Sequence, residues 1–266
     1  MTAAEATTLA LAERAYAIRR TVIRMCMGRG QGYAGQGLSL AELMAVLYFA
    51  ELRPERDRFV LSTGHSAIAL FAVLHELGVY ELGELETYGM DGSRIEESPL
   101  EGTPGFEITG GSLGQGFSQA IGFALGARLS GGDGRVYCLV SDGELQEGQL
   151  WEGAAAAVHH RLDNLVLLVD NNRMQADGAT ADVLNVEPVP EKLAAFGFHA
   201  RRVDAHDLPQ LLDAFAEARG VAGRPSALVL ETVPGKGVPS FEVYEKVHYI
   251  RAEPHVWERA LEELGR

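Results

Sequence analysis

The sequence predicts an α/β protein with a parallel β-sheet that is covered by helices on both faces. Four short segments are continuously apolar, residues 58–62, 135–140, 165–170 and 226–231, and segments with helical periodicity separate them. Strands that are buried on both faces have such runs, and an intervening helix returns the chain for parallel pairing. Because α/β folds of this size are often single domains, we expect one domain over residues 1–266.

The helical segments follow one another in a clear order along the chain. Apolar residues recur at helical spacing over residues 5–27, and the glycine-rich stretch 28–37 ends that helix. Ser39 followed by Glu42 has the spacing of a capping box and predicts a second helix over residues 39–50. Further helices are expected near residues 66–78, from a glycine-rich loop at 102–116 to residue 129, at 147–160 and near 207–219.

Composition and charge exclude several classes of protein. The chain has 266 residues with 47% hydrophobic content, and 23 basic against 37 acidic residues give a formal charge of −14. Such a charge repels nucleic acid and anionic membranes, and no Lys/Arg-rich run offsets it. No leader-like N-terminus and no apolar run of about 18 residues is present, so we expect a cytoplasmic protein. Cys26 and Cys138 are predicted to be core residues.

Polar and small residues follow each predicted strand. In open α/β sheets, ligands bind beyond the carboxyl ends of the strands. That rule selects residues 62–65, 110–116, 141–147, 170–174 and 232–237. All five segments carry small, polar or metal-competent side chains, so we expect the functional site among them.

Two of these segments have the chemistry of a magnesium and phosphate site. Asp142 follows one strand and Asn172 follows the next, and their hard oxygens, with a free backbone carbonyl, are what Mg²⁺ accepts beside a diphosphate. Gly143 would let a phosphate come close. Taken singly, each segment can also be an ordinary strand-to-helix turn, because Asp, Asn, Ser and Gly dominate turns.

Asp-Gly followed at this distance by Asn-Asn resembles the signature of thiamine-diphosphate enzymes, and the chain resembles the N-terminal half of transketolases. The similar segments occur in the family's order: RFVLSTGH, TPGFEITGGSLGQGFSQAIGFALGAR, SDGELQEGQLWEGAAAAVHHRLDNLVLLVDNN and TVPGKG. The resemblance implies a thiamine-diphosphate-binding fold in which Asp142, Asn172 and the carbonyl of Met174 are Mg²⁺ ligands. Ser141 departs from the glycine that is usual in the family.

Further positions receive roles from the same resemblance. His65 corresponds to a histidine that contacts the cofactor diphosphate, and the backbone of Gly111 and Leu113 to the residues that meet the aminopyrimidine ring. Glu147 corresponds to a carboxylate in a hydrogen-bonded relay across a subunit interface. Taken without the family, His65 could be a packing residue, Gly111 part of a helix-opening turn and Glu147 a charge at a helix N-terminus.

Two residues near the C-terminus are similar to active-site positions. His248 falls where the family has a histidine near the substrate oxygen, in a segment that is locally divergent. Lys236 corresponds to a lysine that shapes a loop over the site, and it could equally be a solvated lysine.

Two family histidines are absent. Tyr33 stands where transketolases usually have the histidine of Gly-His-Pro-Gly, and Ser98 stands where a second histidine is expected. The family's histidines serve ketose hydroxyls and proton transfers, whereas a tyrosine phenol stays protonated near neutral pH. We therefore expect Tyr33 in the catalytic site and a substrate other than the ordinary pentose and hexose phosphates; neutral drift within a housekeeping enzyme is the alternative.

The resemblance also implies a partner. Thiamine diphosphate supplies the carbon chemistry, and the protein must orient and ionise it. The family's ionising glutamate lies in a pyrimidine-binding domain that this sequence lacks. We therefore expect a separate C-terminal-half subunit, in a two-plus-two heterotetramer that is active only when assembled.

The expected reaction is transfer of a two-carbon ketol unit from a donor ketose to an aldehyde or other carbonyl acceptor, in a specialised or natural-product pathway. Two alternatives stay open on the sequence. One is a different thiamine-diphosphate reaction, such as decarboxylation or acyl transfer, which the histidine losses permit. The other is a non-catalytic paralogue, against which the intact Asp142, Asn172, His65 and Glu147 argue.

Overall fold

The computed structural model describes residues 2–265, which group into two compact units. One unit, here called the sheet unit, comprises residues 51–64 and 106–231. The other, the helical unit, comprises residues 1–50, 65–105 and 232–266. The single domain expected over residues 1–266 stays a prediction.

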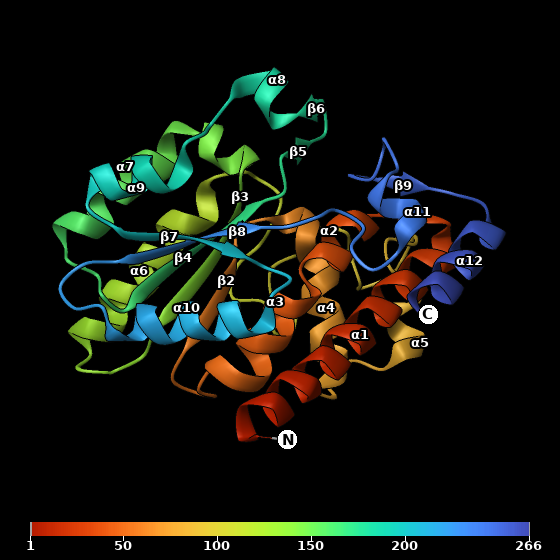
Figure 1. Cartoon of the computed structure of the whole chain (residues 1–266), viewed down its shortest axis with the longest axis horizontal. Coiled ribbons are helices and arrows are strands. Elements are labelled where there is room, and N and C mark those ends of the chain that lie inside the picture. Colours follow the sequence, from red (N-terminus) through yellow and green to blue (C-terminus); the bar gives the residue numbers. More distant parts are fainter. Residues whose placement is uncertain (1, 266) are drawn as a thin grey trace. The chain divides into compact units, whose positions relative to one another are not determined.

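The sheet unit is built on five parallel strands in the order β2-β3-β4-β8-β7 (Figure 1). Their bounds are Arg58–Leu61, Val136–Ser141, Leu165–Asn171, Ser226–Glu231 and His199–Asp204. The four predicted strands are confirmed as β2, β3, β4 and β8. Every residue of β3 and β4 is buried, as their continuously apolar sequences predict.

Helices cover both faces of this sheet, which confirms the predicted α/β class. On one face, α6 (Gln115–Leu129), α7 (Gly148–His159) and α9 (Val189–Phe196) share a core with alternate strand residues such as Val140 and Val169. On the other face lies α10 (Leu208–Gly220), whose Phe215 ring packs edge-on against Tyr137 of β3 at 5.9 Å (Figure 1). The predicted helices ending at 129 and over 147–160 and 207–219 are therefore confirmed.

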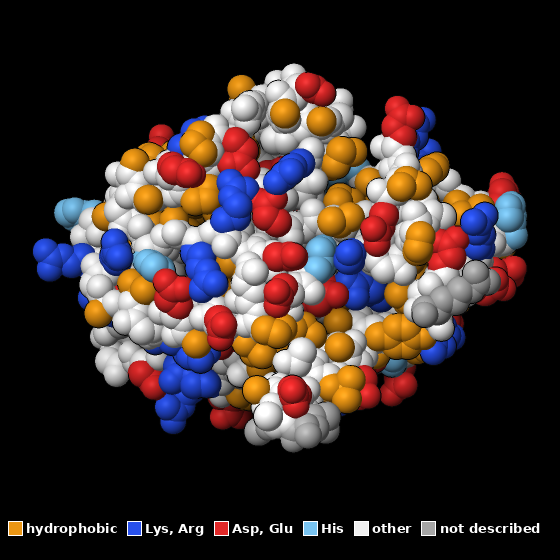
Figure 2. Space-filling view, in the orientation of Figure 1, with side chains coloured by type: hydrophobic (Ala, Val, Ile, Leu, Met, Phe, Trp, Pro, Cys, Tyr) orange, Lys and Arg blue, Asp and Glu red, His pale blue; other side chains and the backbone are white. Residues whose placement is uncertain are grey.

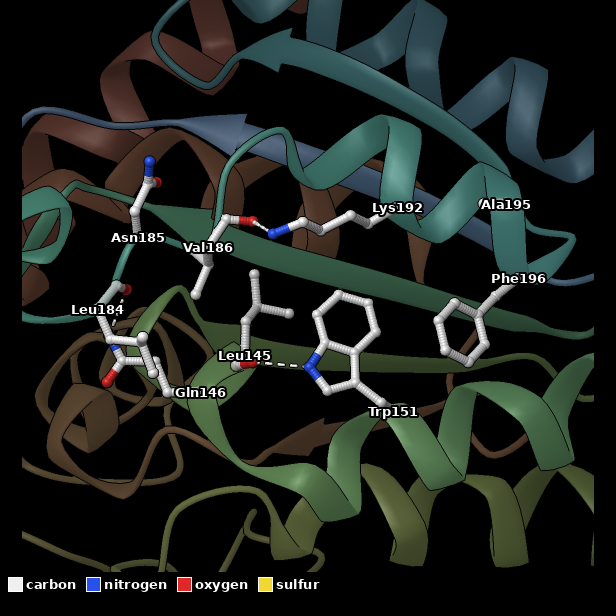
Figure 3. A pocket seen from close by; sticks show the side chains of 9 residues that line it. All are labelled: Leu145, Gln146, Trp151, Leu184, Asn185, Val186, Lys192, Ala195 and Phe196. Carbon is white, nitrogen blue, oxygen red and sulfur yellow. Dashed lines mark hydrogen bonds between the residues drawn. The ribbon is translucent and has the colours of Figure 1, made fainter.

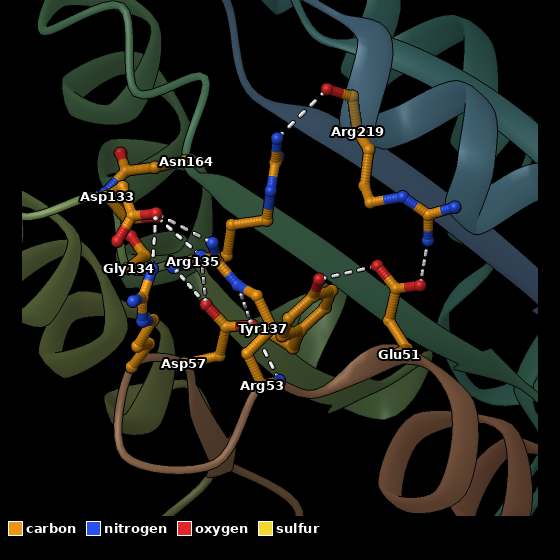
Figure 4. A network of polar contacts seen from close by, with 10 residues as sticks. Glu51, Arg53, Asp57, Asp133, Gly134, Arg135, Tyr137, Asn164 and Arg219 are labelled. Carbon is orange, nitrogen blue, oxygen red and sulfur yellow. Dashed lines mark hydrogen bonds and ion pairs between the residues drawn. The ribbon is translucent and has the colours of Figure 1, made fainter.

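An ionic network ties the segments at the amino end of β2 and β3 (Figure 4). Asp57 accepts hydrogen bonds from the backbone and guanidinium of Arg53 and from the backbone of Arg135, at 2.7–3.0 Å. Arg53 also donates to Asp133 at 2.8 Å. Burial alone would raise the pKa of Asp57, but these hydrogen bonds outweigh it and hold that pKa below its ordinary value.

A second part of the same network joins Glu51 to Tyr137 and Arg219 (Figure 4). The phenol of Tyr137 donates to Glu51 at 2.7 Å, and the guanidinium of Arg219 at the end of α10 completes an ion pair with the same carboxylate. Asn164 donates to the carbonyls of Gly134 and Ala124, which ties the loop before β4 to the loop before β3. Acidic groups at this end of the sheet are thus neutralised within the chain.

An antiparallel hairpin follows β4 and was not expected from the sequence. It pairs β5 (Met174–Gln175) with β6 (Gly178–Ala179), and the short helix α8 (Thr180–Leu184) follows directly. Because Met174 pairs with Ala179, the segment after Asn172 is held by backbone hydrogen bonds beyond the end of the strand.

The helical unit packs its elements around the long helix α1 (Ala3–Arg29), which extends the predicted helix by a few residues at each end. Thr2 caps this helix with a true capping box to Glu5, and Gly30 ends it in the left-handed conformation with φ of +74°. The other elements are α2 (Ala34–Ser39), α3 (Ala41–Val46), α4 (Ala67–Glu76), α5 (Leu82–Leu85), α11 (Pro239–Glu242), α12 (Pro254–Leu264) and the antiparallel pair β1 (Gln31–Gly32) and β9 (Ile250–Arg251).

The capping box predicted at Ser39 and Glu42 is wrong. Ser39 is the last residue of α2, and its hydroxyl donates back to the carbonyl of Gln36 at 2.9 Å. Glu42 is buried and pairs with Arg19 at 2.6 Å, because α1 packs directly against this segment. Ser39 and Glu42 therefore bind other groups in the folded chain and do not cap a helix.

Surface and core properties agree with the composition. Acidic and basic side chains alternate over the face drawn in Figure 2 and do not gather by sign. Cys26 and Cys138 are buried free thiols, as predicted, and burial raises the pKa of both. Among residues 2–265, no helix combines the length and apolar character that crossing a membrane requires.

Candidate functional site

Asp142 follows the last residue of β3, at the carboxyl end of the strand. The residue is only 1% exposed. Its Oδ2 accepts from the backbone of Arg173 and from the hydroxyl of Thr180, both at 2.9 Å. Its Oδ1 is buried and has no hydrogen-bond partner. Burial, the largest influence, raises the pKa of Asp142 to about 6, although these hydrogen bonds act in the opposite direction.

Asn172 lies beside Asp142, because β3 and β4 are adjacent parallel strands. Its Nδ2 donates to Asp170 at 3.0 Å and its Oδ1 accepts from the backbone of Met174 at 2.9 Å. Arg173, between them, has a left-handed φ of +62° and donates its backbone N–H to Asp142. The structure therefore brings together the three residues predicted as Mg²⁺ ligands, Asp142, Asn172 and Met174.

These residues fit a divalent cation. A buried carboxylate oxygen without a donor is costly unless a charge compensates it, and a cation supplies that charge. The amide oxygen of Asn172 and the carbonyl of Met174 are hard ligands of the type that Mg²⁺ prefers. Within residues 2–265, no group of three or more His, Cys, Asp or Glu side chains could hold a metal, so such a site depends on amide and carbonyl oxygens.

Glycines let the loop at residues 110–116 approach the ends of β2 and α7. A side chain at Gly64 would place its Cβ 2.3 Å from the backbone nitrogen of Gly111, and one at Gly116 would meet Ser62 at 2.6 Å. Gly114 has φ of +78°, and a Cβ there would lie 2.9 Å from that of Glu147. The structure thus gathers Gly111 and Glu147 on this loop and its neighbour.

The exposed members of this group are the ones for which the sequence predicted contacts to cofactor or partner. Gly111 and Glu147 are exposed, and Leu113 is 41% exposed. Gly143 is half-buried and opens the turn Gly143–Gln146 beside Asp142. These placements are compatible with ligand contacts, and the assigned roles stay predictions.

Glu144 is the residue of this group that the sequence reasoning missed. It is fully buried, and its carboxylate accepts hydrogen bonds from the hydroxyl of Ser62, from the backbone of Gly114 at 2.9 Å and from the backbone of Ser141 at 2.9 Å. Glu144 thereby joins the ends of β2 and β3 to the glycine-rich loop. Burial, the largest influence, raises its pKa. The Ser141-x-x-Glu144 spacing was the available signal, since it matches the capping-box pattern.

In the helical unit, Tyr33, His65 and His248 form an aromatic cluster. The Tyr33 ring lies 5.8 Å from each imidazole, and the two imidazoles lie 5.5 Å apart. Burial lowers the pKa of His65 to about 4, with a further contribution from His248, whose own pKa is lowered by burial. Both imidazoles are therefore neutral at pH 7. The structure brings together the three predicted catalytic residues of this unit.

Two further aromatic-cluster contacts were not predicted. Tyr249 packs edge-on against Tyr33 at 4.8 Å and donates its hydroxyl to Glu97 at 2.7 Å. Burial, and secondarily Glu97, raises the pKa of Tyr33, so its phenol stays protonated near neutral pH. Gln36 reaches His248 from α2, with 2.7 Å between the amide nitrogen and Nδ1.

The remaining predicted positions of the helical unit lie in loops. Ser98 is half-buried in a segment between α5 and the loop at residue 105. Lys236 is half-buried in a turn whose neighbour, Gly235, donates its backbone N–H to the carbonyl of Gly35 at 3.0 Å. This bond fixes the PGKG turn to α2.

An apolar cavity of about 480 Å³ in the sheet unit holds none of the predicted site residues (Figure 3). Trp151 and Phe196 stand in it with ring centroids 5.4 Å apart, and the Trp151 ring donates to the carbonyl of Leu145 at 2.8 Å. Lys192, its only basic side chain, donates to the carbonyl of Val186 at 2.7 Å. The cavity therefore offers mainly packing surface, and Lys192 is the ionisable side chain in its lining.

Comparison with known proteins identifies the family. Residues 12–253 match the family described as transketolase, thiamine diphosphate binding domain. The chain belongs to the transketolase family. It is 46% identical over 263 residues to a transketolase family protein of Sinorhizobium fredii, covering 95% of this chain and 94% of that protein. It is 36% identical over 265 residues to a 6-deoxy-6-sulfo-D-fructose transketolase subunit of a Clostridium species, covering 96% of each.

Solved structures agree. Transketolase from Leishmania mexicana superposes with a TM-score of 0.88 at 31% identity over 96% of this chain. The chain spans 41% of the length of that transketolase. The predicted family, its α/β fold and its enzyme class, a transketolase-like transferase, are confirmed.

Proposed function

We propose that this chain is the diphosphate-binding subunit of a two-chain transketolase-like enzyme that transfers a two-carbon ketol unit from a donor ketose to an aldehyde or other carbonyl acceptor. The observation that carries the proposal is the buried, unpartnered Oδ1 of Asp142, beside Asn172 and Met174 at the carboxyl end of the sheet. That oxygen suits a Mg²⁺ ion that also holds a diphosphate.

In this proposal, Asp142, Asn172 and the carbonyl of Met174 hold Mg²⁺, and Gly143 admits the diphosphate. Gly111 and Leu113 offer their backbone to the aminopyrimidine ring, and the exposed carboxylate of Glu147 joins the hydrogen-bonded relay with the partner. Bound thiamine diphosphate supplies the nucleophilic carbon and the electron sink of the reaction. The residues of this chain bind and orient it.

In this proposal, His65 contacts the diphosphate. His65, Tyr33 and His248 together face the substrate. Neutral imidazoles can donate one hydrogen bond and accept another, which suits the hydroxyl and carbonyl oxygens of a ketose. Because the pKa of His65 lies near 4, that residue stays neutral through the physiological range.

The partner that we propose is a C-terminal-half subunit carrying the pyrimidine-binding domain and its carboxylate, in a two-plus-two assembly. Two observations support it. The chain matches 41% of the Leishmania enzyme, and it matches the Clostridium protein, which is named a subunit, over 96% of that protein.

Tyr33 and Ser98 support a substrate that differs from ordinary pentose and hexose phosphates, in a specialised or natural-product pathway. A tyrosine fills the space of an imidazole and adds a phenol that stays protonated. We expect Tyr33→Phe to change kcat/KM for different acceptors unequally, by up to about tenfold, since one hydrogen bond contributes about 0.5–1.5 kcal/mol. The affinity for thiamine diphosphate should stay within about twofold, because the proposal gives Tyr33 no contact with the cofactor. An equal loss of substrate and cofactor affinity would show that Tyr33 lies outside the substrate site.

The function is tested by calorimetric titration of thiamine diphosphate with Mg²⁺ into this chain, alone and mixed with a candidate partner encoded beside it. We expect tight binding only in the mixture, because half of the cofactor contacts belong to the partner. Tight binding to the lone chain, or no binding in either sample, would overturn the proposal of a shared site.

A further inference from the structure

Gln36 is buried beside the aromatic cluster in a way that packing alone does not explain. The residue is 1% exposed, lies on α2, and its amide nitrogen is 2.7 Å from Nδ1 of His248. Its Oε1 is buried without a hydrogen-bond partner. Burying an amide of which half is unpaired is unfavourable, and an apolar side chain of similar size would avoid that loss.

The orientation of the amide follows from the same observation. With the nitrogen toward His248, the unpaired group is one carbonyl oxygen. The reversed amide would place an NH₂ group, with two donors, where no acceptor lies. Under-satisfied carbonyls are better tolerated in buried sites than orphaned N–H groups, so the amide donates and Nδ1 accepts.

The imidazole then has a defined tautomer. A neutral histidine has one N–H, and a nitrogen that accepts a hydrogen bond carries no proton. With Nδ1 accepting, the proton lies on Nε2, for which no hydrogen-bond partner exists among residues 2–265. His248 is half-buried and lies 5.5 Å from His65 and 5.8 Å from Tyr33, in the cluster assigned to the substrate.

We propose that Gln36 is a positioning residue that holds the neutral imidazole of His248 in its Nε2–H form and directs this N–H toward an oxygen of the bound substrate. The assignment of the substrate rests on the proposed function, whereas the tautomer does not. His248 thus acts as a hydrogen-bond donor to a carbonyl or hydroxyl oxygen and is unsuited to remove a proton through Nε2.

The chain contains a matched control. Nδ1 of His75 lies 2.8 Å from the carbonyl oxygen of Tyr80, which can only accept, so His75 must carry its proton on Nδ1. The two histidines should therefore show opposite tautomers in one spectrum.

The test is ¹⁵N NMR of the ¹⁵N-histidine-labelled chain near pH 7.5, with His248→Asn and His75→Asn used to assign the signals. We expect Nε2–H for His248 and Nδ1–H for His75. Gln36→Leu should lower the ratio of Nε2–H to Nδ1–H at His248 by about fivefold, the effect of one net hydrogen bond. Gln36→Glu offers only acceptors, so Nδ1 of His248 should become protonated. His75 should not change in either variant.

A wild-type His248 with its proton on Nδ1, or a tautomer that Gln36→Leu and Gln36→Glu leave unchanged, would overturn the proposal, and the wild-type spectrum alone decides the first point if a variant fails to fold. The measurement needs no partner and no cofactor. Correct tautomers together with no cofactor binding in any mixture would refute the proposed function and leave the role of Gln36 toward His248 intact.

Discussion

Two carboxylates at opposite ends of the parallel sheet, Asp57 and Asp142, have opposite electrostatic surroundings. At the amino end, Asp57 receives four hydrogen bonds from Arg53 and Arg135, and its pKa is held below its ordinary value (Figure 4). At the carboxyl end, Asp142 receives only neutral donors, keeps one oxygen unpaired, and has a pKa raised to about 6.

The difference indicates that Asp57 has a structural role and that Asp142 is placed to bind a ligand. The amino end is electrostatically complete, so its charges stabilise the fold without a ligand. At the carboxyl end, Arg173 and Arg202 pair with Glu231, but among residues 2–265 no lysine or arginine side chain pairs with Asp142. A site of this kind is stabilised by a cation and destabilised without one, and perturbed pKa values at such positions are typical of functional sites.

The largest expected effect is on cofactor binding. Asp142→Ala should weaken binding of thiamine diphosphate with Mg²⁺ by more than about 100-fold, since loss of outer-shell partners alone costs 10–100-fold at metal sites. The matched control, Asp133→Ala at the amino end, removes an exposed carboxylate and should leave binding unchanged. Titration calorimetry on the assembled complex measures both. Equal affinities in the two variants would remove the distinction between the ends.

Next in size is the loss of stability at the amino end. Asp57→Asn keeps one acceptor oxygen for four donors, so we expect the free energy of unfolding to fall by about 2–3 kcal/mol. Because the lowered pKa of Asp57 makes its contribution complete above about 4, the loss should be the same at pH 6 and pH 8. Chemical denaturation at both values checks this, and a loss that depends on pH in this range would argue against the network.

Asp142→Asn should increase the free energy of unfolding in chelator-treated protein, whereas Asp57→Asn should lower it. The folded-state pKa of about 6 exceeds the ordinary 3.8, so the folded state binds more protons between these values and wild-type stability falls as pH rises through them. Removing the charge should therefore raise stability by about 1–2 kcal/mol at pH 7.5 and by little at pH 4. Thermal melts across this range measure the difference. A variant that is less stable than wild type at pH 7.5 would show that the unpaired oxygen of Asp142 does not destabilise the folded chain.

The smallest effect concerns Glu144, the carboxyl-end residue whose oxygens are satisfied. Glu144→Gln would turn an amide N–H toward a backbone donor of Ser141 or Gly114, which should cost about 1 kcal/mol and loosen the glycine-rich loop. Hydrogen exchange at the Gly114 amide should accelerate, while exchange in β2 and β7 stays at the wild-type rate. Unchanged exchange at Gly114 would mean that the loop is held by other contacts.

Much of the fold could be predicted because its signals are local. The central strands β3 and β4 are unbroken apolar runs, and the helices of the sheet unit have clear periodicity. The strand β7 was missed because its sequence, HARRVD, is polar: it is an edge strand whose arginines pair with Glu187, Glu217 and Glu231. Charged edge strands avoid aggregation but lack the apolar pattern.

The capping-box spacing shows the limit of local reasoning. Ser39 and Glu42 have it, and tertiary packing gives both side chains other partners. Ser141 and Glu144 have it too, and there the two reciprocal hydrogen bonds form at the site. The spacing alone does not distinguish these outcomes, because the difference is whether a neighbouring helix competes for the carboxylate.

The candidate residues that family motifs select are Asp142 and Asn172 in the sheet unit and His65 in the helical unit, and their roles stay predictions. Gln36 contacts His248, and Tyr249 contacts Tyr33. In each pair the two residues are more than 200 positions apart in the sequence. Only the folded backbone brings them together, so no sequence pattern could have identified them.

The unpaired oxygen of Asp142 also makes the chain a reporter of its own ligands. A molecule that binds only the folded state adds RT ln(1 + [L]/Kd) to its stability, about 2.7 kcal/mol at 100 times Kd. Candidate partner chains could therefore be ranked before any substrate is known, by measuring the melting temperature with Mg²⁺ and thiamine diphosphate held constant. The partner that completes the site would raise the melting temperature most.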